Sequence, residues 1–177
     1  MNAAALYFLG EAREAEGRIA EAENRLTTLT KRFMDSEFYP YGLVKLGKLY
    51  SRQNKNNLAL KTYRLAEKKA ESSNLKAEAI FQIAEHHFMN NRFKLSAESY
   101  RRLIEQYPEH SRSSEAGLQA GWAMHKAERY EDALTYARKE TAKFRNERNT
   151  ELPADKRNKE LAGWRYLMAN ACRQLSK

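Results

Sequence analysis

The sequence repeats at a constant interval, and this repeat restricts the possible folds more than any other feature of the chain. Shifting the 177 residues by 37 positions brings four dipeptides into register, each an apolar residue followed by glycine or alanine: Leu9-Gly10, Leu46-Gly47, Ile83-Ala84 and Ala120-Gly121. The same shift aligns four small residues further along: Ala22, Ala59, Ser96 and Ala133. Three successive intervals of equal length indicate a chain built from similar supersecondary units that stack on one another.

The apolar residues inside each unit follow a helical spacing. In the third unit, two largely apolar stripes stand on either side of Asn90-Asn91, one at positions 79, 80, 83, 84 and 87 and the other at positions 93, 97, 100, 103 and 104. This pattern predicts two helices of about 14 residues joined by a short polar turn. Helices this short are not stable alone, so each pair must gain its stability by packing against neighbouring pairs.

The recurring small residues have a mechanical explanation. Gly10, Gly47, Ala84 and Gly121 fall in the middle of the first predicted helix of each unit. A glycine inside a helix costs about 1 kcal/mol relative to alanine. Its return at one position therefore predicts a close approach of two helix backbones, with larger side chains filling the space between units.

Composition agrees with an all-helical chain. Seven glycines and three prolines are few for this length, whereas a sheet protein with many tight turns would need more. Cys172 is the single cysteine, which excludes an internal disulfide. The apolar stretch at residues 3–9 is too short to cross a membrane. The sequence leaves the compartment open: periplasmic or envelope-associated if the chain is a fragment of a bacterial envelope protein, and cytoplasmic otherwise.

The order of residues within a unit resembles the tetratricopeptide repeat (TPR). Leu-Gly, a turn, an aromatic residue, alanine, a second aromatic residue and a late proline follow one another, most clearly at residues 93–108 and 120–134. The resemblance implies a right-handed α-solenoid of antiparallel helix pairs. It divides residues 3–150 into four repeats, at about 3–39, 40–76, 77–113 and 114–150. The unit is longer than the usual TPR of about 34 residues, and in this it is similar to bacterial cell-envelope members of the family.

The register ends after the fourth unit. Residues 146–159 are polar and contain Pro153, which predicts mostly loop. A last helix is expected at residues 161–175, with Trp164, Leu167, Met168 and Ala171 on one face. Residues 151–177 are therefore expected to form a loop and a C-terminal helix, which is either half of a fifth repeat or a cap.

No residue pattern points to catalysis. The densest candidate is Glu85-His86-His87, but adjacent residues on a helix point about 100° apart and do not easily share one metal ion. Packing or surface histidines explain the pair better. The sequence shows no His-Glu-x-x-His, no paired cysteines and no phosphate-binding glycine loop. We therefore expect no enzyme, no cofactor and no catalytic or metal site.

The resemblance places a partner on the concave face formed by the first helices of successive repeats. The positions that it assigns to this groove are Tyr7, Tyr41, Lys45, Lys48, Arg52, Phe81, Gln82, Glu85, Phe88, Gln119, Trp122 and His125. The alternative for Phe81, Phe88 and Trp122 is packing between helices. Some TPR proteins grip a terminal carboxylate with a lysine and an asparagine in the first helix. This chain has Tyr7 and Glu11 there, which argues against that function.

Positive charge is concentrated in the second 37-residue repeat. Residues 38–76 hold nine basic and two acidic side chains, a net +7 of the chain's +9, and Lys45, Lys48 and Arg52 fall on the predicted groove. We therefore predict a scaffold that binds a protein or peptide, acidic if the basic groove is used, within a larger bacterial assembly at the envelope. The alternatives are a self-associating structural module and a binder of an acidic polymer. Of the polymers, nucleic acid is disfavoured because no known binding module is present.

Overall fold

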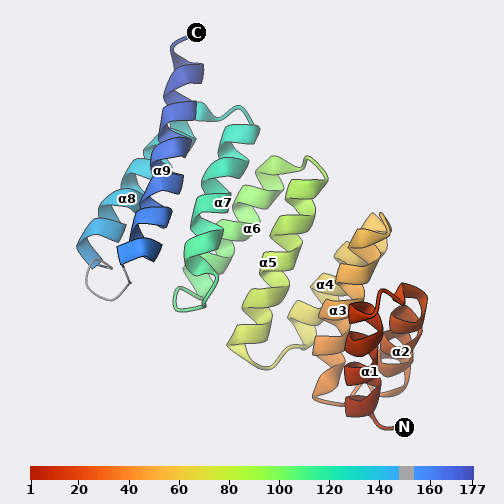
Figure 1. Ribbon diagram of the computed structural model, residues 1–177. Coiled ribbons are helices and arrows are strands. Elements are labelled where there is room, and N and C mark those ends of the chain that lie inside the picture. Colours follow the sequence, from red (N-terminus) through yellow and green to blue (C-terminus); the bar gives the residue numbers. More distant parts are fainter. Residues whose placement is uncertain (148–153) are drawn as a thin grey trace. The chain divides into compact units, whose positions relative to one another are not determined.

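The chain is all-helical, as predicted. The computed structural model describes residues 1–147 and 154–177, and within this part it contains nine helices and no strand (Figure 1). The helices are α1 (Ala3–Ala15), α2 (Ile19–Arg32), α3 (Phe38–Arg52), α4 (Asn56–Lys69), α5 (Ser73–Met89), α6 (Phe93–Gln106), α7 (Ser113–Lys126), α8 (Tyr130–Glu147) and α9 (Ala154–Leu175). Most are within a turn of the predicted length.

The turn inside each of the first four helix pairs returns at the interval seen in the sequence. The second helices begin at Ile19, Asn56, Phe93 and Tyr130, a constant step of 37 residues. Two residues before each start, one residue has a positive φ angle: Gly17 (76°), Asn54 (58°), Asn91 (57°) and Glu128 (61°). Glycine and asparagine adopt this left-handed conformation most readily, and it closes a helix C-terminus. The break at Asn90-Asn91 is therefore a helix end, not merely a polar interruption.

The chain forms two compact units, Met1–His86 and His87–Lys177. In the first unit, α1, α2 and α3 share a core made mainly of leucine and alanine: Ala3, Leu6, Ala22, Leu26, Leu29, Leu46 and Leu49. A second cluster joins α3, α4 and the start of α5: Tyr39, Leu43, Val44, Ala66, Ala70, Leu75 and Ala79. Each helix therefore buries one face against two neighbours, as stacked helix pairs require.

The helical glycines of the first unit lie where helices approach closely. A Cβ atom added to Gly47 on α3 would lie 2.5 Å from Cε1 of Tyr63 on α4, and one added to Gly10 on α1 would lie 2.8 Å from Cγ of Leu26 on α2. Real Cβ atoms do not come this near to another carbon. The sequence had predicted a packing reason for these glycines, and Tyr63 and Leu26 provide it.

In the second unit, α9 packs against both α7 and α8. The buried face of α9 carries Trp164, Leu167 and Ala171, which were predicted to share a face. The predicted start of the last helix was wrong, because α9 begins at Ala154 and residues 154–159 are helical. Lys156, Arg157 and Lys159 are good helix formers, so their polarity alone was a poor indicator of loop. The remainder of that predicted loop, residues 148–153, lies outside the described residues.

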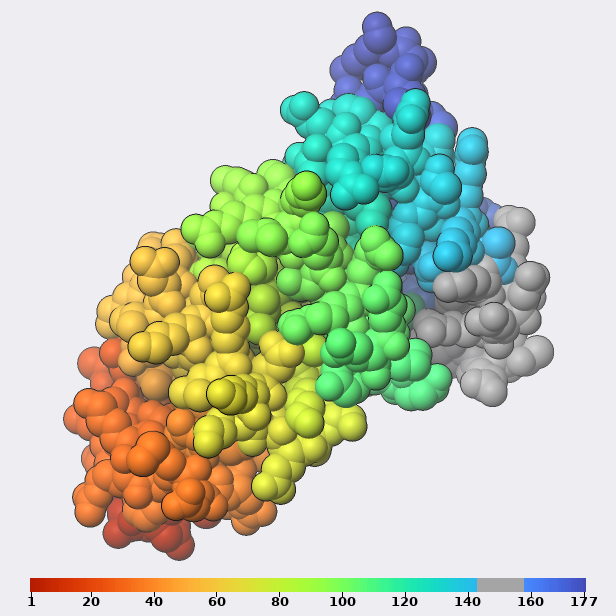
Figure 2. All heavy atoms as spheres, turned by 180° about the vertical axis from the view of Figure 1, so that it is seen from behind, coloured from red at the N-terminus to blue at the C-terminus, as the bar shows by residue number. Residues whose placement is uncertain are grey.

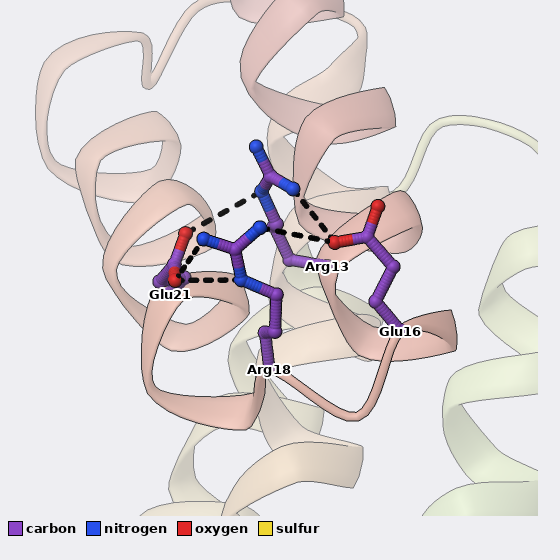
Figure 3. Close-up of polar contacts among 4 residues, drawn as sticks. All are labelled: Arg13, Glu16, Arg18 and Glu21. Carbon is purple, nitrogen blue, oxygen red and sulfur yellow. Dashed lines mark hydrogen bonds and ion pairs between the residues drawn. The ribbon is translucent and has the colours of Figure 1, made fainter.

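Four charged side chains surround the turn between α1 and α2 (Figure 3). Arg13 Nη1 lies 2.6 Å from Glu16 Oε2, and Arg18 Nε donates to Glu21 Oε1 at 2.7 Å. Cross pairs at 3.3 Å (Arg18–Glu16) and 3.4 Å (Arg13–Glu21) close the ring. The hydrogen bond from Arg13 is the main cause that lowers the pKa of Glu16 below its ordinary value. Since all four side chains are solvated, the network orders the turn more than it stabilises the fold.

Replacing Arg13 with Gln is expected to raise the pKa of Glu16 toward the ordinary carboxyl range, because the principal hydrogen bond is lost. A carboxyl whose folded pKa is lowered stabilises the fold above its unfolded pKa, and that contribution disappears as the pH falls through the lowered value. Carboxyl NMR titration measures the shift. Arg32→Gln, at an exposed arginine outside the network, is the matched control and should leave Glu16 unchanged. An equal titration curve for Arg13→Gln and the wild type would contradict the assignment.

Candidate functional site

Four aromatic side chains gather on the first helices of the first unit. The Tyr7 ring centroid lies 5.4 Å from Phe8, 5.6 Å from Phe38 and 6.3 Å from Tyr41. Phe8 and Phe38 are 5.8 Å apart. We call these four residues the aromatic cluster. Phe8 is 58% exposed and Tyr41 43% exposed, so two rings of the cluster face solvent while the other two support them.

Beside the aromatic cluster, three ion pairs connect α1 to α3 and α3 to α5. Lys45 Nζ lies 2.6 Å from Glu11 Oε1, Arg52 Nη1 lies 2.6 Å from Glu14 Oε1, and Lys48 Nζ lies 3.0 Å from Glu78 Oε1. We call these six residues the ion-pair ladder. All three cations of the predicted basic groove belong to it. The groove is therefore close to neutral at this point, and an acidic ligand would have to displace carboxylates that are already in place.

Tyr7 joins the aromatic cluster to the ion-pair ladder. Its hydroxyl donates to Glu11 Oε1 at 3.2 Å, and the same oxygen faces Lys45. Burial first, and then the charge of Glu11, raise the pKa of Tyr7 to about 12. Tyr7 thus stays a neutral hydrogen-bond donor at any physiological pH. Gln82 has a similar position at the other end of the ladder, where its amide donates to Glu78 Oε1 at 3.0 Å.

Phe81 does not face solvent. It is only 2% exposed, which favours the alternative that it packs in the interior. Val44 and Leu118 occupy the equivalent positions one repeat before and after it. His86 and His87 are also buried, each at 3%, and the His86 ring lies 6.4 Å from that of Tyr63. Glu85, which directly precedes His86 in the chain, is half-buried.

The second unit has an aromatic group of its own on α7, α8 and α9. Trp122 lies 5.5 Å from His125 and 5.6 Å from Tyr166, and His125 lies 5.1 Å from Tyr130. Burial lowers the pKa of His125, so the imidazole is neutral at physiological pH. Tyr166 is 65% exposed. Gln119 is half-buried on the same helix as Trp122.

The predicted groove residues therefore fall into two groups. Tyr7, Tyr41, Lys45, Lys48, Arg52 and Gln82 lie on the first unit, and Gln119, Trp122 and His125 lie on the second. Phe88, also in the second unit, is half-buried and stacks edge-on against Phe93 at 5.3 Å, which favours packing. The sequence did not indicate Phe38, Glu14 or Glu78 as site residues. Phe38 belongs to the aromatic cluster and the two glutamates to the ion-pair ladder only because of which helices lie side by side.

Within residues 1–147 and 154–177, no group of three or more histidine, cysteine, aspartate or glutamate side chains is arranged to hold a metal ion. No helix in the same part of the chain is long and apolar enough to cross a membrane.

Comparison with known families gives one match, for residues 78–110, to the family described as tetratricopeptide repeat. These residues form a tetratricopeptide repeat. The resemblance predicted from the sequence is thereby confirmed. The match includes the left-handed residue Asn91, whose counterparts at the other three turns have the same backbone conformation. No curated protein matches this sequence.

Solved TPR structures share the fold of this chain. A MamA RS-1 double mutant superposes with a TM-score of 0.65 at 14% identity, covering 99% of this chain and 97% of that one. A Podosopora anserina protein with nearly identical TPR-like repeats gives 0.67 at 12% identity, covering 96% and 92%. YrrB, described as a TPR protein with an unusual peptide-binding site, gives 0.62 at 12% identity, covering 99% and 93%. At such low identity these likenesses establish the solenoid fold and nothing about ligands.

Proposed function

We propose that this TPR chain is a protein-interaction scaffold that binds a peptide segment of a partner protein on the first helices of its first unit. The carrying observation is the aromatic cluster, in which Phe8 and Tyr41 are exposed although both are large and apolar. Exposed aromatic side chains held in place by half-buried ones, here Tyr7 and Phe38, are suited to anchor a partner on a binding surface. The fold adds support, since solved TPR neighbours include a peptide-binding protein.

The proposed peptide is anchored by apolar or aromatic side chains and not by acidic ones alone. The ion-pair ladder neutralises Lys45, Lys48 and Arg52, so these cations contribute polar rim contacts more than net attraction. An apolar side chain on the aromatic cluster, with polar peptide groups along the ladder, fits both features. The bacterial-envelope setting remains a proposal that rests on the style of the sequence.

Changing Phe8 and Tyr41 together to Ala is expected to weaken peptide binding about tenfold or more, because two anchors are lost. Peptides selected from a displayed random library on the wild-type chain serve as probes, and fluorescence anisotropy measures their affinity. Leu95→Ala on α6 removes an equally exposed apolar side chain elsewhere and is the matched control. Selected peptides that bind the double variant as tightly as the wild type would rule out this surface.

The same assay can separate the contribution of the ion-pair ladder to peptide affinity from that of the aromatic cluster. Exchanging the charges of one pair, Glu14→Arg with Arg52→Glu, preserves an ion pair while reversing its direction, and it leaves the hydrogen bond between Tyr7 and Glu11 in place. If the cations only form the rim, the exchange changes affinity little. A loss as large as that of the double aromatic variant would instead favour a charge-led groove and an acidic peptide.

A further inference from the structure

The positive charge of the second predicted repeat is divided between two places. Lys45, Lys48 and Arg52 are bound in the ion-pair ladder, and Lys55 pairs with Glu23 at 3.3 Å. Of the five remaining cations, Lys76 lies on α5 and the other four lie on α4. The four on α4 are all exposed and take part in no ion pair within the described residues: Lys61, Arg64, Lys68 and Lys69. Most of the unneutralised charge therefore belongs to the second helix of the pair, not to the first.

The orientation of α4 is fixed by its buried face. Ala59, Tyr63 and Ala66 are 2% exposed or less, so the opposite face must point outward. That face carries Leu58, Lys61, Arg64 and Lys68, and Leu65 lies at its edge, half-buried and partly packed against the core cluster that contains Ala66. We call these five residues the α4 stripe. Figure 2, seen from behind, shows the gold and yellow part of the chain that includes α4 open at the surface. Leu58 is 48% exposed, although a leucine gains nothing from contact with water.

The α4 stripe has the spacing of a helix-pairing surface. Leu58, Lys61, Leu65 and Lys68 follow each other at intervals of three, four and three residues, which is the seam of two helices packed side by side. Two leucines one heptad apart alternate with two lysines one heptad apart, and Arg64 flanks them. The only acidic residue of α4, Glu67, is half-buried on the flank of the stripe.

The other repeats do not share this charge pattern. At the positions of Lys61, Arg64 and Lys68, α6 has Glu98, Arg101 and Glu105, with Arg101 and Glu105 paired at 3.3 Å. The corresponding residues of α2 are Asn24, Thr27 and Lys31. The fold thus tolerates neutral or acidic side chains at these positions. Three unpaired cations on one helix are therefore not a requirement of the repeat.

We propose that the α4 stripe docks an amphipathic helix of a partner protein in which aspartate or glutamate alternates with apolar residues at the same three–four spacing. Acidic side chains pair with Lys61, Arg64 and Lys68, and the partner's apolar residues cover Leu58 and Leu65. A second copy of this chain does not fit, because like charges would face each other. A bare polyanion would use the cations but leave Leu58 in water. This surface is separate from the aromatic cluster and does not depend on the proposed peptide site.

The test uses a three-heptad helical peptide with leucine and glutamate at alternating seam positions, and a scrambled peptide of identical composition. Calorimetry measures both against the full chain. The designed peptide is expected to bind at least tenfold more tightly than the scrambled one. Replacing Lys61, Arg64 and Lys68 with Asn, Thr and Ala is expected to reduce its affinity at least tenfold, and Leu58→Ala about threefold or more.

The matched control removes the same net charge on three other helices, at exposed cations that form no ion pair in the part of the chain that the structure describes: Lys31→Ala, Lys94→Asn and Arg138→Thr. It should bind the designed peptide like the wild type, as should the Phe8→Ala/Tyr41→Ala variant. Circular dichroism confirms that each variant is folded. Three outcomes would assign the stripe to polyanions and overturn the proposal. The first is equal binding of the scrambled peptide, and the second is an unchanged affinity of the Leu58→Ala variant. The third is competition by heparin that is lost when the same three cations are replaced. A wild-type chain that binds neither peptide would also overturn it.

Discussion

Replacing Gly47 with Ala is expected to destabilise the first unit by about 1 to 3 kcal/mol, although alanine is the better helix former. The added Cβ would lie 2.5 Å from Cε1 and 2.7 Å from Cδ1 of Tyr63. The Tyr63 ring cannot move aside, because it is 2% exposed and packs against Ala59 and Ile83. Burial also raises the pKa of Tyr63, as expected for a phenol enclosed by the fold. Overpacking therefore exceeds the gain in helix propensity.

The same substitution at Gly117 should have the opposite sign. Its nearest neighbour, Cζ2 of Trp164, would be 3.5 Å from the new Cβ, an ordinary contact, so Gly117→Ala is expected to stabilise the chain by about 0.5 to 1 kcal/mol. Both tryptophans lie in the second unit. Circular dichroism reports the unfolding of both units and tryptophan fluorescence only that of the second. A Gly47→Ala chain as stable to urea as the wild type would show that α3 and α4 can separate without cost.

Much of the fold could be predicted because the residues that define it recur. Gly47 and Tyr63 belong to columns that return every 37 residues, and the turn residues Gly17, Asn54 and Asn91 return at the same interval. Because the same pattern occurs in several repeats, an ambiguous residue in one repeat does not change the prediction of the fold. The start of α9 fell outside the period, and there the sequence had to be interpreted from polarity alone. That rule failed because Lys and Arg are favourable on the exposed face of a helix.

The candidate site was harder to predict because it depends on which side chains meet across helices. The sequence shows Lys45 and Arg52 as excess positive charge, but their partners Glu11 and Glu14 stand on α1, at different positions of the repeat, and become neighbours only when α1 packs on α3. Phe81 was assigned to the groove by its position in the family resemblance. Its column, with Val44 and Leu118, is apolar in three repeats, and that pattern indicates burial more reliably than aromatic character does.

Changing Trp164 to Ala is expected to have the largest effect of all, about 3 to 5 kcal/mol on the stability of the second unit. Trp164 is 4% exposed and forms a cluster with Ala137 and Leu167, and its ring meets Tyr136 edge-on at 6.0 Å. It is the largest side chain that holds α9 against α7 and α8. Truncation leaves a cavity that these rigid helices cannot fill.

The loss should appear first in α9. Hydrogen exchange is expected to show faster exchange of its amides than of those in α7, because α9 has a partner on one side only among the described helices. Tyr166→Ala, on the exposed face of the same helix, is the control and should change stability by less than about 0.5 kcal/mol. If Trp164→Ala left the exchange of α9 unchanged, Leu167 and Ala171 would suffice to dock it. Since Trp122 lies against Tyr166 of α9, release of α9 would also dismantle the aromatic group of the second unit.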